Sequence, residues 1–200
     1  MDLSRSVGKF ATNSIYRWDF GASDWVDTGV KGSFLVYDRF ISDRAFGQTK
    51  RLVMTPLDQA IDITVPKGIY KIEGNSARFM IESVNEDTGE EVSYANVYMF
   101  HDVAYPIVVK KDVGVLRASG IGKKDTPEVQ DTLWADYSRY SAVNSREMGT
   151  VDYTVINLFL PRGTNIDTDC YVELDGMVFD VSEVATSLNI LTCRAQRRGV

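Results

Sequence analysis

The sequence predicts a mainly β protein made of antiparallel sandwich-like or barrel-like subdomains, with a long loop and one short helix. Three observations indicate this class. Short runs of alternating apolar and polar residues follow one another closely, no convincing helical period separates them before residue 116, and Gly, Asp and Pro mark the turns. Closely spaced strands joined by such turns are typical of antiparallel sheets.

The predicted strands form one group before residue 116 and a second group after residue 149. In chain order the runs are 33–41, 51–54, 61–65, 77–84, 92–100, 106–111, 151–160, 171–174, 177–181 and 189–195. Pro66 directly follows the run 61–65, and Pro56 follows the run 51–54 after one residue. That placement fits strand ends, because proline has no N–H to donate to a ladder.

Asp175-Gly176 is the strongest local signal in the chain, because it separates two apolar runs by two residues. A type I′ turn needs positive φ at both central positions, and Asp-Gly supplies it at low cost. We therefore predict a tight hairpin here. The polar stretch 85–90, which contains Gly89, predicts a second hairpin with a longer loop.

The middle segment, 117–148, has a different residue pattern. A Gly- and Lys-containing stretch is followed by Thr126-Pro127, a pair suited to capping and starting a helix. Apolar residues then recur at helical spacing at Val129, Leu133, Trp134 and Tyr137. The pattern predicts a short helix from about residue 127 to Tyr137, inside a loop-rich insertion.

We therefore divide the chain into an N-terminal arm (1–32), a β-rich domain (33–116), the insertion (117–148) and a C-terminal β domain (149–200). The last is either separate from 33–116 or continuous with it. The arm carries three aromatic residues without helical spacing, Trp18, Phe20 and Trp25. It is either a frayed terminus pinned by these residues or an arm that reaches a neighbouring subunit.

Composition sets further bounds. A chain of 200 residues can bury roughly 70% of its unfolded surface, so it needs no disulfides to fold. Cys170 and Cys193 are accordingly predicted to be small buried thiols. The net charge of −6 argues against a dedicated nucleic-acid binder. No signal peptide and no membrane-spanning apolar run is evident, which predicts production in a cytoplasm.

Candidate catalytic motifs fail on their context. Asp27-Thr28-Gly29 and Asp87-Thr88-Gly89 resemble the paired motifs of aspartic proteases, but Asp87 lies in an acidic turn. Gly122-Lys123 lacks the remaining positions of a phosphate-binding loop. His101 is the lone histidine, with no recognisable nucleophile beside it. We expect no catalytic residues and no enzymatic activity.

Metal and cofactor sites are not expected either. One histidine and two cysteines give no zinc spacing. Four acidic residues occur close together, Asp167, Asp169, Asp175 and Asp180, without the order of an EF-hand. Asp side chains bond to their own following backbone, so turns explain three of them.

The last quarter of the chain carries a pattern of its own: a strand ending at Pro161, an Asp-rich turn, the Asp175-Gly176 hairpin, the strand segment Phe179-Asp180-Val181 and a final Arg-rich strand. This pattern resembles the head–tail joining proteins (connectors, adaptors or head-closure proteins) of tailed bacteriophages. Residues 1–116 have no counterpart in the simplest members, which leaves a neck, collar, nozzle or tail-tube role open.

The resemblance implies a structural virion protein, assembled in the host cytoplasm, that forms a homo-oligomeric ring, a hexamer or dodecamer, between portal and tail. Its partners would be further copies of itself, the portal protein and tail or neck proteins. DNA would pass through the channel without sequence-specific binding, and no membrane would be involved. The residues expected at its interfaces are of types that commonly anchor protein contacts. They are Trp18, Phe20, Trp25, Trp134, Tyr137, Arg194, Arg197 and Arg198.

Two alternatives stay open. Aromatic side chains also stack on sugars, so the chain could be a carbohydrate- or receptor-binding β module of a tail fibre or a capsid decoration. A hydrolase on a β scaffold is the second alternative, although no catalytic constellation supports it. The arginines near the C-terminus are open to two interpretations as well: a solvated tail, or a surface that docks on acidic groups or DNA.

Overall fold

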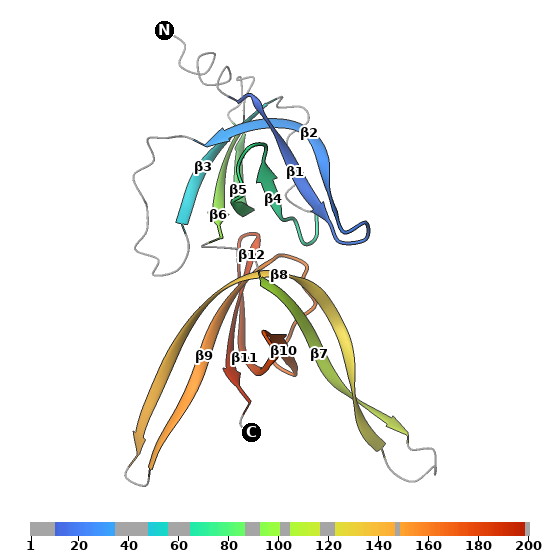
Figure 1. The fold of residues 1–200 in the computed structure, drawn as a ribbon, viewed down its shortest axis with the longest axis vertical. Coiled ribbons are helices and arrows are strands. Elements are labelled where there is room, and N and C mark those ends of the chain that lie inside the picture. The colour runs from blue at the N-terminus through green and yellow to red at the C-terminus, as the bar shows by residue number, and fades with distance from the viewer. Residues whose placement is uncertain are drawn as a thin grey trace. The chain divides into compact units, whose positions relative to one another are not determined.

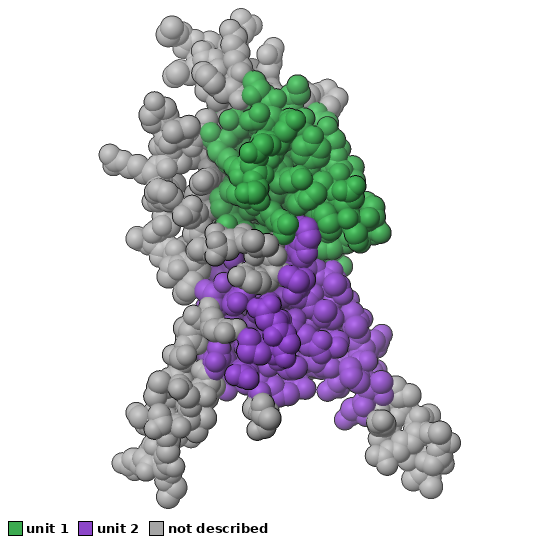
Figure 2. Space-filling view, in the orientation of Figure 1, with its two compact units in different colours: residues 1–104, 188–190 green, residues 105–187, 191–200 purple. Residues whose placement is uncertain are grey.

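The structure, a computed structural model, describes residues 11–34, 48–55, 65–86, 93–100, 105–116, 123–146 and 149–198. Within these ranges all the regular secondary structure is β-strand, which confirms the predicted mainly β fold class. The chain divides into two compact units, coloured separately in Figure 2. Unit 1 comprises residues 1–104 and the short turn 188–190, and unit 2 comprises 105–187 and 191–200.

Unit 1 is a closed barrel in the strand order β1-β2-β3-β6-β5-β4 (Figure 1). Its strands are β1 (Asn13–Asp19), β2 (Asp24–Phe34), β3 (Gln48–Thr55), β4 (Tyr70–Ile72), β5 (Arg78–Glu86) and β6 (Ser93–Met99). Alternate residues point to opposite faces of a strand, so Phe79 and Ile81 of β5 face the core together with Ala95 and Val97 of β6. Period-2 alternation thus builds the interior of this barrel.

The first strands of unit 1 correct the expected N-terminal arm. Residues 13–34 form the β1–β2 hairpin, and Ile15 and Val30 from its two strands lie in the barrel core. Burial of these two side chains, with Phe34 packed against the same core, outweighs the polar, Gly-dotted composition that suggested an arm. Residues 1–10 lie outside the described ranges.

Unit 2 is a second closed barrel, in the order β10-β11-β12-β9-β8-β7. Its strands are β7 (Tyr105–Leu116), β8 (Lys123–Arg146), β9 (Gly149–Pro161), β10 (Cys170–Leu174), β11 (Met177–Ser187) and β12 (Ile190–Arg197). The two-residue turn is as predicted: Leu174 pairs with Met177, and φ is 51° at Asp175 and 73° at Gly176. A Cβ at residue 176 would meet no atom, so its glycine serves the backbone conformation and no close approach.

The predicted helix and long loop between residues 117 and 148 are wrong. Residues 123–146 form one strand of 24 residues, β8, which is about 80 Å long at the usual strand rise. Burial alternates along it, since Asp131, Leu133 and Ala135 are buried while Thr132 is exposed. Pairing with β7 and β9 overrides the helical spacing seen in the sequence, because each half of β8 satisfies backbone groups in a ladder with one of these strands.

Strand β8 changes partner along its length, as Figure 1 shows. Lys123–Ala135 pairs with β7, and Asp136–Arg146 pairs with β9. Each half therefore belongs to a long hairpin with its partner, and both hairpins extend as two-stranded ribbons from the barrel of unit 2.

Of the other predicted strands, 51–54, 77–84, 92–100, 106–111 and 151–160 correspond to β3, β5, β6, β7 and β9. The run 33–41 corresponds to β2 only as far as Phe34. Its remainder and nearly all of 61–65 lie outside the described residues.

Candidate functional site

The outer wall of unit 1 carries a cluster of aromatic side chains, here called the aromatic surface: Tyr16, Trp18, Phe20 and Trp25. Ile15 points into the core, so Tyr16 and Trp18 point outward on the same strand. Trp18 pairs directly with Trp25 across the β1–β2 hairpin, and their ring centroids lie 5.3 Å apart in an edge arrangement. The Trp18 and Phe20 rings are 6.4 Å apart, also edge to face.

Two cations complete this surface from neighbouring strands. Lys71 Nζ lies 4.5 Å from the centre of the Trp25 ring and 5.5 Å from that of Tyr16. The Arg78 guanidinium lies 5.9 Å from the Trp25 ring centre, and burial lowers the pKa of Arg78. Cations held over ring faces in this way stabilise the rings' orientation. The aromatic surface is thus ordered before any partner arrives.

The turn between β1 and β2 also has its conformation fixed by hydrogen bonds. The Asp19 carboxylate accepts hydrogen bonds from the backbone N–H groups of Gly21 (2.8 Å) and Ala22 (3.1 Å). The bond from Ala22, followed by that from Gly21, lowers the pKa of Asp19. A carboxylate bonding its following backbone is typical turn chemistry, so the hairpin that presents the tryptophans is closed by its own sequence.

Sequence reasoning selected Trp18, Phe20 and Trp25, and the structure brings these three together. It missed Tyr16, Lys71 and Arg78. Tyr16 alternates with Trp18 and could have been found by period-2 spacing. Lys71 pairs with Tyr16 through the β1–β4 ladder, a long-range contact that no local pattern announces. Trp134 and Tyr137 lie half-buried on β8 of unit 2 and do not belong to this cluster.

Arg198 is part of the unit 2 structure, which corrects its interpretation as a solvated tail or free docking residue. Its Nε donates to Asp180 Oδ1 at 2.9 Å, and its guanidinium lies 4.6 Å from the centre of the Tyr171 ring. Its backbone N–H also donates to the carbonyl of Val178 at 2.9 Å. The hydrogen bond with Asp180 raises the pKa of Arg198. Ala195, on the same strand β12, is fully buried.

Replacing Arg198 with Ala is expected to lower the free energy of unfolding of unit 2 by about 1 kcal/mol. Both side chains of its ion pair are about half exposed, and exposed ion pairs and exposed cation–π contacts each contribute at most about that amount. Urea denaturation measures the change. Arg197→Ala, at an exposed neighbour, is the control and should change stability by less than about 0.5 kcal/mol. Equal effects of the two variants would contradict a contribution of the Arg198 contacts to the stability of unit 2.

Lysines on β7 hold the β9–β10 connection and strand β10 in place. Lys111 Nζ lies 2.8 Å from Asp167 Oδ2 and 3.1 Å from Asp169 Oδ2, and Lys110 Nζ lies 2.7 Å from Glu173 Oε1. The hydrogen bonds that Lys111 donates, first to Asp167 and then to Asp169, raise the pKa of Lys111, and the bond from Lys111 lowers the pKa of Asp167. Two members of the acidic cluster thus have structural partners.

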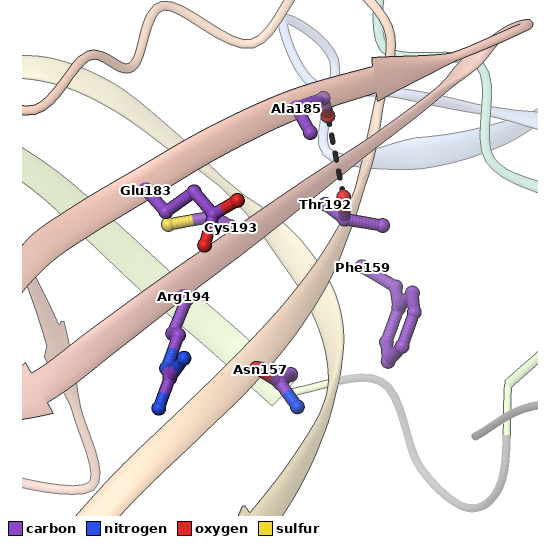
Figure 3. Close-up of a pocket in the computed structure, with 7 residues that line it drawn as sticks. All are labelled: Asn157, Phe159, Glu183, Ala185, Thr192, Cys193 and Arg194. Carbon is purple, nitrogen blue, oxygen red and sulfur yellow. Dashed lines mark hydrogen bonds between the residues drawn. The ribbon is translucent and has the colours of Figure 1, made fainter. Parts of the chain in front are cut away.

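The outer face of unit 2 holds a shallow groove of about 370 Å³ across β9, β11 and β12 (Figure 3). It is lined by Asn157, Phe159, Glu183, Ala185, Thr192, Cys193 and Arg194. Thr192 Oγ1 donates to the carbonyl of Ala185 at 3.3 Å, which links the two strands under the groove. An apolar ring and alanine beside a guanidinium and a carboxylate suit a mixed polar and apolar protein segment.

The remaining candidates have structural roles where they are described. Asp27 Oδ1 accepts from the N–H of Gly29 at 2.9 Å, and Thr28 Oγ1 donates to the carbonyl of Ile15 at 2.7 Å, so this triplet shapes β2. Cys170 and Cys193 are free and buried, as predicted. Burial raises the pKa of the Cys193 thiol to about 12.

Asp87-Thr88-Gly89, His101 and Gly122 lie outside the described residues. Over the part of the chain that is described, no three His, Cys, Asp or Glu side chains are grouped so that they could hold a metal ion. The described part of the chain also contains no helix long and apolar enough to cross a membrane.

Comparison with known proteins gives little. No family model matches the sequence, and no curated protein matches it. A solved structure described as the virion of a native gene transfer agent (GTA) particle contains a chain with 15% identity and a TM-score of 0.37. The match covers 48% of this chain and 94% of that chain. A likeness at this level assigns neither a fold nor a function to this chain.

Proposed function

We propose that this protein is a non-enzymatic structural component of a tailed-phage virion, a head–tail connector or neck subunit that forms a ring between portal and tail. Copies of the chain surround the channel through which DNA passes. The portal on one side and a tail or neck protein on the other are its remaining partners. The pattern over the last quarter of the chain supports this assignment.

The observation that carries the proposal is the pair of long ribbons that β8 forms with β7 and β9. Strands of globular proteins usually have about 3–10 residues, and an isolated two-stranded hairpin is at best marginally stable in water. β8 has 24 residues. On the β7–β8 ribbon, residues 112–114 and 125–129 are all exposed. Ribbons of this kind gain stability by docking on other subunits, and a ring supplies such neighbours.

The aromatic surface offers a second docking element in a different unit. Trp, Tyr and Arg are the residue types enriched at the energetic centres of protein interfaces. The rings of the aromatic surface are already held in place by cations and by a closed turn, so little side-chain entropy is lost on docking. A connector has to meet at least two partners besides itself, and this surface supplies one contact that is separate from the ribbons.

Light scattering after size exclusion, together with negative-stain microscopy, tests the proposal. The purified protein, alone or with a portal ring, is expected to form closed rings of a fixed copy number. A phage lacking this gene should accumulate filled heads and separate tails, and the cloned gene should restore joining. A protein that stays monomeric alone and with portal, in a phage whose heads and tails still join, would contradict it.

A carbohydrate-binding module is the second candidate, and the aromatic surface is the observation that favours it. Indole rings on a β-barrel wall stack on sugar faces. Glycan binding by a monomer or trimer, lost in Trp25→Ala and accompanied by no ring formation, would support this function in place of the first.

A further inference from the structure

The ribbon formed by β7 and β8 has two chemically different faces. In the register Lys110 is opposite Val129, Asp112 is opposite Pro127, and Gly114 is opposite Asp125. Because partners in register share a face, these residues lie on one side and continue the outer face of the barrel. We call this side the outer ribbon face. Glu128 and Val113 lie on the other side.

The outer ribbon face is apolar and acidic. Val129 is 55% exposed, an unusual value for a large apolar side chain in a strand. Pro127 and Asp125 next to it are exposed as well. Lys110, a basic residue on this face, is held by Glu173 at 2.7 Å. A second one, Lys123, is in register with Leu116 at the far end of the same face. Around Val129 and Pro127 the charge comes from Asp125 and Asp112, and apolar side chains between acids are suited to a complementary protein surface.

The groove on β9, β11 and β12 has the complementary chemistry. Phe159 and Ala185 supply apolar walls, and Arg194 supplies a guanidinium. In Figure 3 the Arg194 side chain extends away from the Glu183 carboxylate on β11. The cation and the anion thus occupy different sides of the groove. A volume of about 370 Å³ accommodates side chains of the size of valine and proline.

We infer that the outer ribbon face of one subunit docks in this groove of a second copy of the same chain, with Asp125 beside Arg194 and Val129 against Phe159. The inference rests on the proposed ring. Two different surfaces that fit each other make a head-to-tail contact, and such contacts close into rings when the rotation permits. Burial of the ribbon's apolar side chains offsets the weak stability of a two-stranded hairpin.

Charge reversal tests this contact. Asp125→Arg and Arg194→Glu each place like charges at the contact and should weaken assembly at least about tenfold in sedimentation experiments. The double variant restores an opposite pair with the signs exchanged, and its assembly should return to within about threefold of the parent. The weakening should be smaller at high salt, since screening reduces the repulsion. Both positions of charge change are exposed, so melting curves should match the parent.

Matched controls lie on the same strands. Glu128→Arg changes the same charge on the opposite face of the ribbon, and Arg197→Glu changes an exposed arginine three residues farther along β12. Both should assemble like the parent. Glu183→Gln should strengthen assembly, because it removes a carboxylate from a groove that receives an acidic face. A variant that merely damaged the fold would not produce such a gain.

The outcomes separate this inference from the ring itself. If the parent forms rings and Asp125→Arg and Arg194→Glu form them equally well, the ribbon does not dock in the groove, and the proposed ring stands on another contact. If both single variants fail and the double variant is not restored, the pairing of these two residues is wrong. If the parent stays monomeric over the whole concentration range and with portal, the proposed ring and this contact are both overturned.

Discussion

A variant with alanine at both Trp18 and Trp25 is expected to fold and to leave phage heads and tails unjoined. The two indoles form the centre of the aromatic surface, with ring centroids 5.3 Å apart. Truncating a residue at the centre of an interface typically costs 2 kcal/mol or more, so losing both should weaken docking by about a thousandfold. Infectious titre in complementation of a phage lacking this gene measures the loss.

Stability has to be measured beside function, because the pair also contributes to unit 1. An aromatic pair of this kind contributes about 0.5–1.5 kcal/mol beyond its buried area, which leaves a folded barrel. Val26→Ala is the matched control, since Val26 directly follows Trp25 on β2, is in register with Arg17 and is 43% exposed. It should support joining like the parent. A Trp18 and Trp25 double variant with unchanged titre would mean that this surface docks on no virion partner.

Replacing Phe79 or Phe179 with Ala is expected to destabilise one unit and leave the other unchanged. Both rings are fully buried, Phe79 in the core of unit 1 and Phe179 in unit 2. Emptying such a site costs about 3–5 kcal/mol, a large part of the stability of a small domain. Each variant serves as the other's control.

The three tryptophans allow the two units to be followed separately. Trp18 and Trp25 belong to unit 1, and Trp134 belongs to unit 2. In a Trp134→Phe background, fluorescence reports unit 1 alone, and with Trp18 and Trp25 replaced by Phe it reports unit 2. Phe79→Ala should shift the first signal in urea and Phe179→Ala the second. Equal shifts of both signals by either variant would show that the units unfold as one cooperative body.

The sequence by itself determined the fold class, because strand periodicity and turn chemistry are local. Alternation marks Phe79 and Ile81 as one face of a strand whatever lies opposite. Asp175-Gly176 specifies its hairpin for the same reason: positive φ at both residues depends on their own side chains and not on distant contacts. The two cysteines were also predictable as buried thiols, since they lie within or beside apolar strands.

The tertiary structure alone decided the long strand β8. Its apolar residues fit a helix as well as a strand when read along the chain, and only pairing with β7 and β9 resolves the ambiguity. The same holds for residues 13–34, where core burial of Ile15 and Val30 converts a polar, aromatic-dotted stretch into barrel wall.

Side-chain partners from distant strands were likewise beyond the sequence. Trp18 and Trp25 were recognisable as anchors by type, but the two cations over the Trp25 ring come from β4 and β5, more than forty residues away. Arg198 looks like a tail residue in the sequence, and only the closed barrel places Asp180 and Tyr171 beside it. Local conformation follows from local residues, whereas the partners of a side chain depend on how strands far apart in the chain are ordered in the sheet.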